Sequence, residues 1–165
     1  MEVKKVGAES IPIVQSLVTI TWPFTYKEIL SAAQLSYMLQ LIYSAESLQN
    51  QIEKQGHQFI LGSDDKAAVG FASYGSKNAA SPAIFKLHKI YIDPGHQGKG
   101  IGKILLDYIL HDIKLAGSRE LELNVNRHNK ALGFYQRFGF KIIDEQDIPI
   151  GNGYFMNDYI MRLNW

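Results

Sequence analysis

Residues 90–103 read IYIDPGHQGKGIGK: an apolar strand end, a Pro-Gly turn and a glycine-rich segment. Apolar residues then recur at helical spacing as far as Leu115, and Gly117 suits the end of a helix. Glycine lets the backbone approach a ligand closely, and the first turn of a helix presents unpaired N–H groups and the positive end of its dipole. This order of elements therefore predicts a phosphate site, with local positive charge from Lys99 and Lys103.

Two common phosphate-binding motifs do not fit these glycines. A Walker A loop needs a Gly-Lys pair followed by Ser or Thr at a fixed spacing, and no such residue follows here. A dinucleotide-binding motif lies after a first strand with a Gly-x-Gly-x-x-Gly spacing, which Gly98, Gly100 and Gly102 do not have. A glycine-rich turn with no ligand stays open as an alternative.

On either side of this segment the chain alternates between strand and helix patterns. Trp22 to Tyr26 is expected to break the first helix, and residues 62–65 to form the turn of a hairpin. These patterns predict an α/β domain, with a mixed sheet carrying helices on its faces. The expected strands are residues 3–6, 58–61, 66–74, 83–92, 120–125, 140–143 and 154–163, and the expected helices are residues 10–20, 33–43, 45–55, 100–115 and 130–138.

Composition narrows the possible functions. The 165 residues are 46% hydrophobic, which suits one domain spanning residues 1–165. Seventeen basic and 16 acidic residues leave a formal charge of +1, so we expect no nucleic-acid partner and no membrane association. The chain has no cysteine, no signal-peptide pattern and no apolar run of the ~20 residues that a membrane span needs. A cytoplasmic protein is expected, with no cysteine nucleophile.

Two motifs resemble the GNAT acyltransferases. Gln97-x-x-Gly100-x-Gly102 is similar to the acetyl-CoA loop of that family, which begins with Gln or Arg. Residues 129–140, NKALGFYQRFGF, are similar to the family's Asn-x-x-Ala-x-x-Phe-Tyr-x-x-x-Gly-Phe segment, although Gly133 replaces a better helix former. The resemblance implies a GNAT fold: a central mixed, mostly antiparallel twisted sheet of six to seven strands flanked by about four helices.

The same resemblance implies a role for each matched residue. Backbone groups of the strand ending at Ile92 would pair with the pantetheine arm and polarise the thioester carbonyl, the glycine loop would hold the pyrophosphate, and Asn129 would contact the cofactor arm. The implied acetyl-CoA-binding residues are Ile90, Tyr91, Ile92, Gln97, Gly98, Lys99, Gly100, Ile101, Gly102, Lys103, Asn129 and Tyr135.

Two residues are candidates for catalysis by direct transfer of the acetyl group. Tyr135 is the candidate general acid beside the departing sulfur, and its alternative role is core packing. His88 stands where many relatives place a glutamate that accepts the amine proton, and strand parity puts it on one face with Lys86 and Ile90. Its alternative role is that of an ordinary half-exposed strand histidine. His57, His96, His111 and His128 lack metal-ligand spacing, so we expect no metal.

The acceptor is expected to be a small primary amine, polyamine-like or amino-acid-like. Residues 22–26 and 152–156, with Tyr37 and Glu28, would hold it or else belong to the core. Lys86 and Lys89 are expected to be solvated, and Asn124 and Asn126 either line the cleft or cap a turn. Residues 37–59 are faintly similar to bacterial polyamine acetyltransferases. Protein N-terminal or lysine acetylation and a non-catalytic acyl-CoA-binding regulator remain alternatives, and a homodimer is possible.

Overall fold

A computed structural model describes residues 1–165, and its centre is one seven-stranded sheet in the order β1-β2-β3-β4-β5-β7-β6. Every neighbouring pair is antiparallel except β4 and β5, which are parallel. The predicted mixed, mostly antiparallel sheet is thus confirmed. Its strands are β1 (Glu2–Val6), β2 (Gln58–Asp64), β3 (Ala67–Asn78), β4 (Ser81–Ile92), β5 (Glu120–Asn126), β6 (Lys141–Gly151) and β7 (Tyr154–Asn164).

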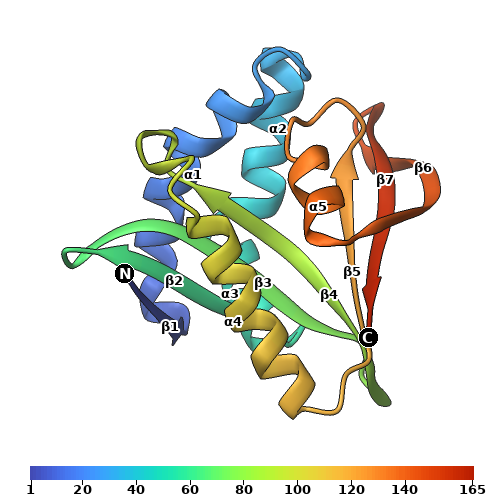
Figure 1. Cartoon of the computed structure of the whole chain (residues 1–165). Coiled ribbons are helices and arrows are strands. Elements are labelled where there is room, and N and C mark those ends of the chain that lie inside the picture. The colour runs from blue at the N-terminus through green and yellow to red at the C-terminus, as the bar shows by residue number, and fades with distance from the viewer.

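Five α-helices cover the two faces of this sheet (Figure 1). The helices α4 (Ile101–Leu115) and α5 (Leu132–Phe138) lie on one face, and α1 (Ile11–Tyr26), α2 (Ala32–Tyr43) and α3 (Ala45–Glu53) lie on the other. None of the helices has the length and apolar character needed to cross a lipid bilayer.

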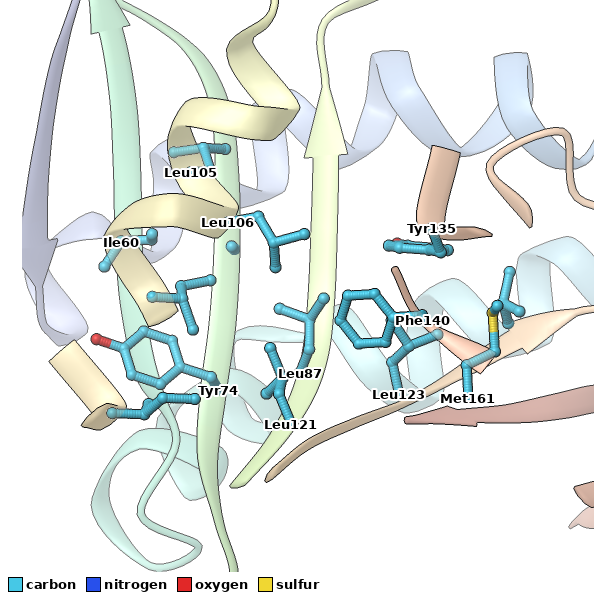
Figure 2. Packing of buried hydrophobic residues seen from close by; sticks show 14 of the residues in the cluster. Ile60, Tyr74, Leu87, Leu105, Leu106, Leu121, Leu123, Tyr135, Phe140 and Met161 are labelled. Atoms are coloured by element: carbon cyan, nitrogen blue, oxygen red, sulfur yellow. The ribbon is translucent and has the colours of Figure 1, made fainter. Parts of the chain in front are cut away.

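Each face of the sheet buries its own apolar cluster. Under α4, the side chains of Leu105 and Leu106 meet sheet residues such as Ile60 and Leu87, as Figure 2 shows. On the opposite face, Trp22 of α1 belongs to a cluster with residues of α2, α3, β2 and β3. The sheet is therefore held from both sides, which fixes the strands that carry the site.

The first helix is longer than predicted. It continues through Pro23 to Tyr26, although a proline inside a helix removes one backbone hydrogen bond and costs about 3 kcal/mol. Trp22 and Tyr26 are both buried on the sheet side, and the Lys27 N–H donates to the Pro23 carbonyl at 3.1 Å. Burial of these two aromatic rings offsets the lost bond, so the predicted break at residues 22–26 is wrong.

Two other boundaries differ from the predictions. The β2–β3 turn lies at Asp65 and Lys66, which both have positive φ, while Gly62 stays in the strand at a register shift. The strand β6 extends well past the predicted residue 143 because it pairs with β7 along its whole length, as far as Gly151 opposite Tyr154. In both hairpins the strands pair up to turns whose residues have positive φ, Asp65 and Lys66 in one and Asn152 and Gly153 in the other.

The parallel strands β4 and β5 pair along only half of their length. Their register runs from Ile84 opposite Glu120 to Leu87 opposite Leu123 and stops there, although both strands continue. Beyond that point they diverge, as Figure 1 shows. This opening in the middle of the sheet leaves backbone groups of both strands without a neighbouring strand.

Candidate active site

An irregularity in β4 lies at the point where the two strands part. Ser73 pairs with Lys89 and Tyr74 with Leu87, so that His88 is an extra residue opposite β3. Such a β-bulge bends the strand and re-aims its side chains. The predicted parity holds for Lys86, which lines one cavity together with His88, but it is wrong for Ile90, which packs against the α4 cluster on the other face, while Lys89 joins the cavity.

After the bulge, the backbone of β4 presents two residues to the opening. The Asp93 N–H donates to the Val69 carbonyl of β3 at 2.8 Å. Along an antiparallel strand, the backbone groups of every second residue point to the same neighbouring strand. The N–H and C=O groups of Ile90 and Ile92 therefore face the β5 side, where no strand pairs with them. The Ile92 carbonyl accepts a bond from the Gln97 side-chain amide at 3.4 Å. An extended ligand carrying amide groups fits this edge in the way that a strand would.

The glycine-rich segment connects β4 to α4. Gly98 and Gly100 have φ of +77° and +78°, and a Cβ atom built at either would meet no other group within 4 Å. Gly100 is the N-cap of α4, whose first-turn N–H groups have no partner within the helix. Lys99 is exposed, and Lys103 pairs with Asp107 at 2.6 Å on the helix surface. The loop is thus an open backbone surface at the positive end of a helix, which fits a pyrophosphate.

The third glycine serves a different purpose. A Cβ atom at Gly102 would lie 3.4 Å from the ring of Phe134 in α5. Ile101, next to it, is buried in the cluster under α4. These two residues therefore dock the start of α4 on the protein, and contacts to a phosphate from them would come from backbone N–H groups.

A cavity of about 230 Å³ opens beside the bulge. Its walls come from four regions of the chain that are far apart in sequence. They are the helices α1 and α2, the diverging strands β4 and β5, and the hairpin of β6 and β7. The lining residues are Trp22, Tyr26, Leu30, Met38, Ile42, Tyr43, Lys86, Leu87, His88, Lys89, Tyr91, Asn124, Asn126, Phe155, Met156 and Asp158.

Hydrogen bonds join α2 to the β6–β7 hairpin beside this cavity. The side-chain amide of Gln34 donates to the Phe155 carbonyl at 2.8 Å, and the Tyr37 hydroxyl donates to the Ile150 carbonyl at 2.7 Å. The rings of Tyr37 and Tyr154 are 5.3 Å apart. Tyr37 thus joins two elements next to the cavity but does not line it, and Glu28 does not line it either.

Aromatic rings form the inner wall. The Trp22 ring packs against Tyr26, Tyr43 and Tyr91 with centroid distances of 4.7, 5.2 and 5.8 Å. The Trp22 N–H donates to the Tyr43 hydroxyl at 3.1 Å, and the hydroxyls of Tyr26 and Tyr91 share a hydrogen bond of 2.8 Å. Trp22 and Tyr26 were expected either to belong to the core or to hold the acceptor. They belong to a core cluster and they also line the cavity.

The charged residues of the cavity contradict one prediction. Lys89 was expected to be solvated, yet it is 8% exposed, its Nζ donates to Gln51 Oε1 at 2.6 Å, and it lies over the rings of Tyr43 and Phe59. Burial lowers the pKa of Lys89 to about 8. Lys86 is half-buried, and its pKa is also lowered by burial. The bulge places both lysines on the α1–α3 face, so the prediction of solvated positions is wrong.

Sequence reasoning missed the one carboxylate of the cavity, Asp158 of β7. It is 5% exposed, and burial raises its pKa. A hydrogen bond from Asn124 at 3.4 Å and the charges of Lys86 and Arg127 act to lower the pKa, but burial outweighs them. The alternating pattern of residues 154–163 could have shown that the Asp158 side chain faces the interior. Nothing in the neighbouring sequence shows that it lies close to β4. Asn126 both lines the cavity and caps a turn, since its side-chain oxygen accepts from the His128 N–H.

His88 lies in the cavity wall with its ring stacked on His57 at 3.7 Å between centroids. Burial, followed by the charges of His57, Lys89 and Lys86, lowers the pKa of His88 to about 3. The imidazole is therefore neutral at physiological pH and has a free lone pair. Its lowered pKa makes it a weak proton acceptor.

Tyr135 of α5 is buried in the cluster under α4 and does not line the cavity. Its ring packs on Phe134 and Phe140, and burial, with a smaller contribution from Tyr26, raises its pKa well above the usual value. The phenol thus stays protonated. Asn129 is held before α5 by its side-chain oxygen, which accepts from the Ala131 N–H at 2.9 Å. No group of three or more His, Cys, Asp or Glu side chains is arranged to hold a metal ion.

Comparisons with known proteins agree with this geometry. A family profile described as "Acetyltransferase (GNAT) domain" matches residues 26–159. Spermidine N(1)-acetyltransferase of Thermoplasma acidophilum is 29% identical over 149 residues, which cover 87% of this chain and 90% of that protein.

Solved structures show the same similarity. The crystal structure of PaiA N-acetyltransferase from Thermoplasma acidophilum in complex with coenzyme A superposes with a TM-score of 0.82 at 25% identity, over 99% of this chain and 98% of that one. An aminoglycoside 6′-N-acetyltransferase complexed with coenzyme A, 16% identical over 99% of this chain and 97% of its own, shares the fold with a TM-score of 0.68.

Proposed function

The chain belongs to the GNAT acetyltransferase family and is an acetyl-CoA-dependent N-acetyltransferase, and we propose that its acceptor is the primary amine of a small molecule. The observation that carries this proposal is the cavity beside the β4 bulge. Its volume of about 230 Å³ suits a small acceptor, and it opens where β4 and β5 part. An acceptor held there would lie next to the exposed backbone groups of Ile90 and Ile92.

The hydrogen bonds between α2 and the β6–β7 hairpin beside the cavity favour a small amine over a protein. A lysine side chain or N-terminus of a protein acceptor needs an open groove for the peptide on both sides of the reacting amine. Here Gln34 and Tyr37 of α2 bind carbonyl groups of the β6–β7 hairpin and close that route. Protein acetylation would require these bonds to break.

Two regions of the chain would hold acetyl-CoA, which supplies an activated acetyl thioester. The N–H groups of the glycine loop and of the first turn of α4 would bind the pyrophosphate, with Lys99 and Lys103 beside it. The edge of β4 would pair with the pantetheine arm, and Asn129 would contact the arm from the opposite side. We retain for this role Ile90, Tyr91, Ile92, Gln97, Gly98, Lys99, Gly100, Ile101, Gly102, Lys103, Asn129 and Tyr135.

The chemistry is direct acetyl transfer. The amine nitrogen loses a proton and forms a bond to the acetyl carbon, the carbon–sulfur bond breaks, and the CoA thiolate gains a proton. An N–H group of the β4 edge would stabilise the developing oxyanion, and the protonated Tyr135 phenol would donate the proton to sulfur. No covalent intermediate on the enzyme is needed.

Two side chains are candidates for the proton acceptor. His88 is neutral and lines the cavity, but with a pKa of about 3 it can only relay a proton to another group and does not stay protonated. Asp158 is a stronger base because burial raises its pKa. The pH dependence of kcat/KM distinguishes them. Loss of the acidic limb in Asp158→Asn, with an unchanged profile in His88→Ala, assigns the role to Asp158, and the opposite pattern assigns it to His88.

A non-catalytic acyl-CoA-binding regulator is the competing function. It would need the glycine loop but not the Tyr135 phenol or an amine cavity. The test is calorimetric binding of acetyl-CoA followed by a screen for free CoA release with polyamines, amino acids and peptides. The proposal expects binding together with amine-dependent CoA release from a small acceptor. Binding without release from any acceptor would favour the regulator.

A further inference from the structure

Lys86 is a cation of the cavity that forms no direct ion pair. The charges of Glu122, which lies opposite Lys86 in β5, and of Asp158 attract it, but Glu122 is already paired with Lys77 and Arg162. Lys86 lies on β4 one residue before the cavity-lining Leu87, and it is half-buried. Neighbouring cations are engaged: Lys77 pairs with the carboxylate of Glu122 at 2.8 Å, and Lys89 donates to the Gln51 side chain. Lys86 forms neither an ion pair nor a side-chain hydrogen bond, so its ammonium group is available to a ligand.

The balance of charge in the cavity points to the nature of that ligand. Two ammonium groups, Lys86 and Lys89, face one carboxylate, Asp158, while the two stacked histidines nearby are neutral. A partly desolvated ammonium group is unfavourable, so burial lowers the pKa of Lys86 although the charges of Glu122 and Asp158 act to raise it. Binding of an anion beside Lys86 would stabilise the charged form of its ammonium group. The wall opposite is apolar and includes Trp22 and Met38.

Building on the proposed function, we propose that the acceptor is an amine of the amino-acid class, with a carboxylate close to its amino group and an apolar side chain, and that Lys86 binds this carboxylate. Asp158 lies in the same cavity but forms no ion pair with Lys86, so one acceptor can place its amino group toward Asp158 and its carboxylate toward Lys86. The apolar side chain would lie against the aromatic wall.

This arrangement disfavours a polyamine. Spermidine carries several ammonium groups and no anion, so a bound spermidine would bring further positive charge beside Lys86 and Lys89. Like charges placed together in a partly desolvated site repel strongly. The similarity to a spermidine N(1)-acetyltransferase therefore extends to the fold and the acetyl-CoA machinery, and we infer that it does not extend to the acceptor.

Matched acceptors test the proposal with the full-length protein. Initial rates of CoA release are measured with leucine, methionine and phenylalanine, with the amide of each, with 3-methylbutylamine and with spermidine. The variants are Lys86→Met, which removes the charge, Lys86→Arg, which keeps it, and Lys54→Met as a control at an exposed lysine outside the cavity. Melting temperature and the Kd of acetyl-CoA verify that each variant folds and binds the co-substrate.

We expect wild type to prefer at least one amino acid over its amide by about tenfold or more in kcat/KM, the range of a hydrogen bond to a charged group. Lys86→Met should lose about that factor with the amino acid, mainly as a raised KM, and change little with 3-methylbutylamine. Lys86→Arg should keep the preference, and Lys54→Met should match wild type.

Two results would overturn the proposal in distinguishable ways. If spermidine or 3-methylbutylamine is used better than every amino acid, or if Lys86→Met leaves the preference for the carboxylate intact, the assignment of Lys86 is wrong while the small-amine function stands. If no small amine releases CoA although acetyl-CoA binds, the proposed function fails and this assignment fails with it.

Discussion

Replacing Gly98 or Gly100 by alanine should weaken acetyl-CoA binding by far more than it weakens the fold. Both glycines have positive φ, and a Cβ atom there meets nothing within 4 Å, so alanine introduces backbone strain without a clash. Holding a non-glycine residue in that region costs about 1 to 2 kcal/mol. For a domain of this size, that cost corresponds to a fall of roughly 2 to 8 °C in melting temperature.

Gly117 at the end of α4 provides a matched control. Its φ is +91°, a Cβ atom there also meets nothing within 4 Å, and it lies at the opposite end of the helix from the loop. Gly117→Ala should therefore lose a similar amount of stability and keep wild-type affinity for acetyl-CoA.

The loop variants should lose affinity as well. A Cβ atom on the open side of the loop, and a shift of its backbone, would remove one or more N–H bonds to a phosphate, each worth about 1.5 to 3 kcal/mol. The expected rise in Kd is about tenfold to a hundredfold. Thermal unfolding and calorimetric titration with acetyl-CoA measure the two effects separately. Equal affinities in Gly100→Ala, Gly98→Ala and Gly117→Ala would refute a pyrophosphate site in this loop.

Three further predictions test other parts of the account. Tyr135→Phe should lower kcat by about a hundredfold or more with an unchanged Kd for acetyl-CoA, and near-normal turnover would remove Tyr135 as the general acid. Leu106→Ala should lose about 2 to 5 kcal/mol in denaturant unfolding because Leu106 is fully buried, whereas Leu115→Ala, at 77% exposure on the same helix, should change stability by less than about 0.5 kcal/mol. Burial acts to raise the pKa of Glu122, but hydrogen bonds from Lys77 and Arg162 outweigh it and lower the pKa. Glu122 therefore stabilises the fold above its unfolded pKa and loses that effect as the pH falls through its folded pKa, so Glu122→Gln should flatten the acid side of a melting-temperature profile.

The sequence was most informative where local geometry needs a particular residue. Gly100 caps α4 with a positive φ, Gly117 and Gly56 follow helix ends with positive φ, and Asp93-Pro94-Gly95 ends β4, so these boundaries could be read directly. The same applies to the glycine-rich loop, where Gly98 and Gly100 have positive φ. At these positions the glycine in the sequence and the positive φ of the backbone imply each other.

Tertiary contacts decided what the sequence could not show. Pro23 remains inside α1 because the aromatic residues around it are buried against the sheet. The β4 bulge at His88 changes the parity of the residues after it, such as Lys89 and Ile90, and it is visible only in the register between β3 and β4. Asp158 reaches the cavity because β7 pairs beside β5, a contact between residues distant in the chain. Strand parity predicts neither a bulge nor the order of strands.

The rate of CoA release from acetyl-CoA, measured with and without small amines, tests the central claim most directly. We predict a rate that saturates with the concentration of an amino-acid acceptor and that falls sharply in Tyr135→Phe while acetyl-CoA binding persists. Acetyl-CoA binding with no amine-dependent release, or release that the Tyr135 variant leaves unchanged, would contradict the account.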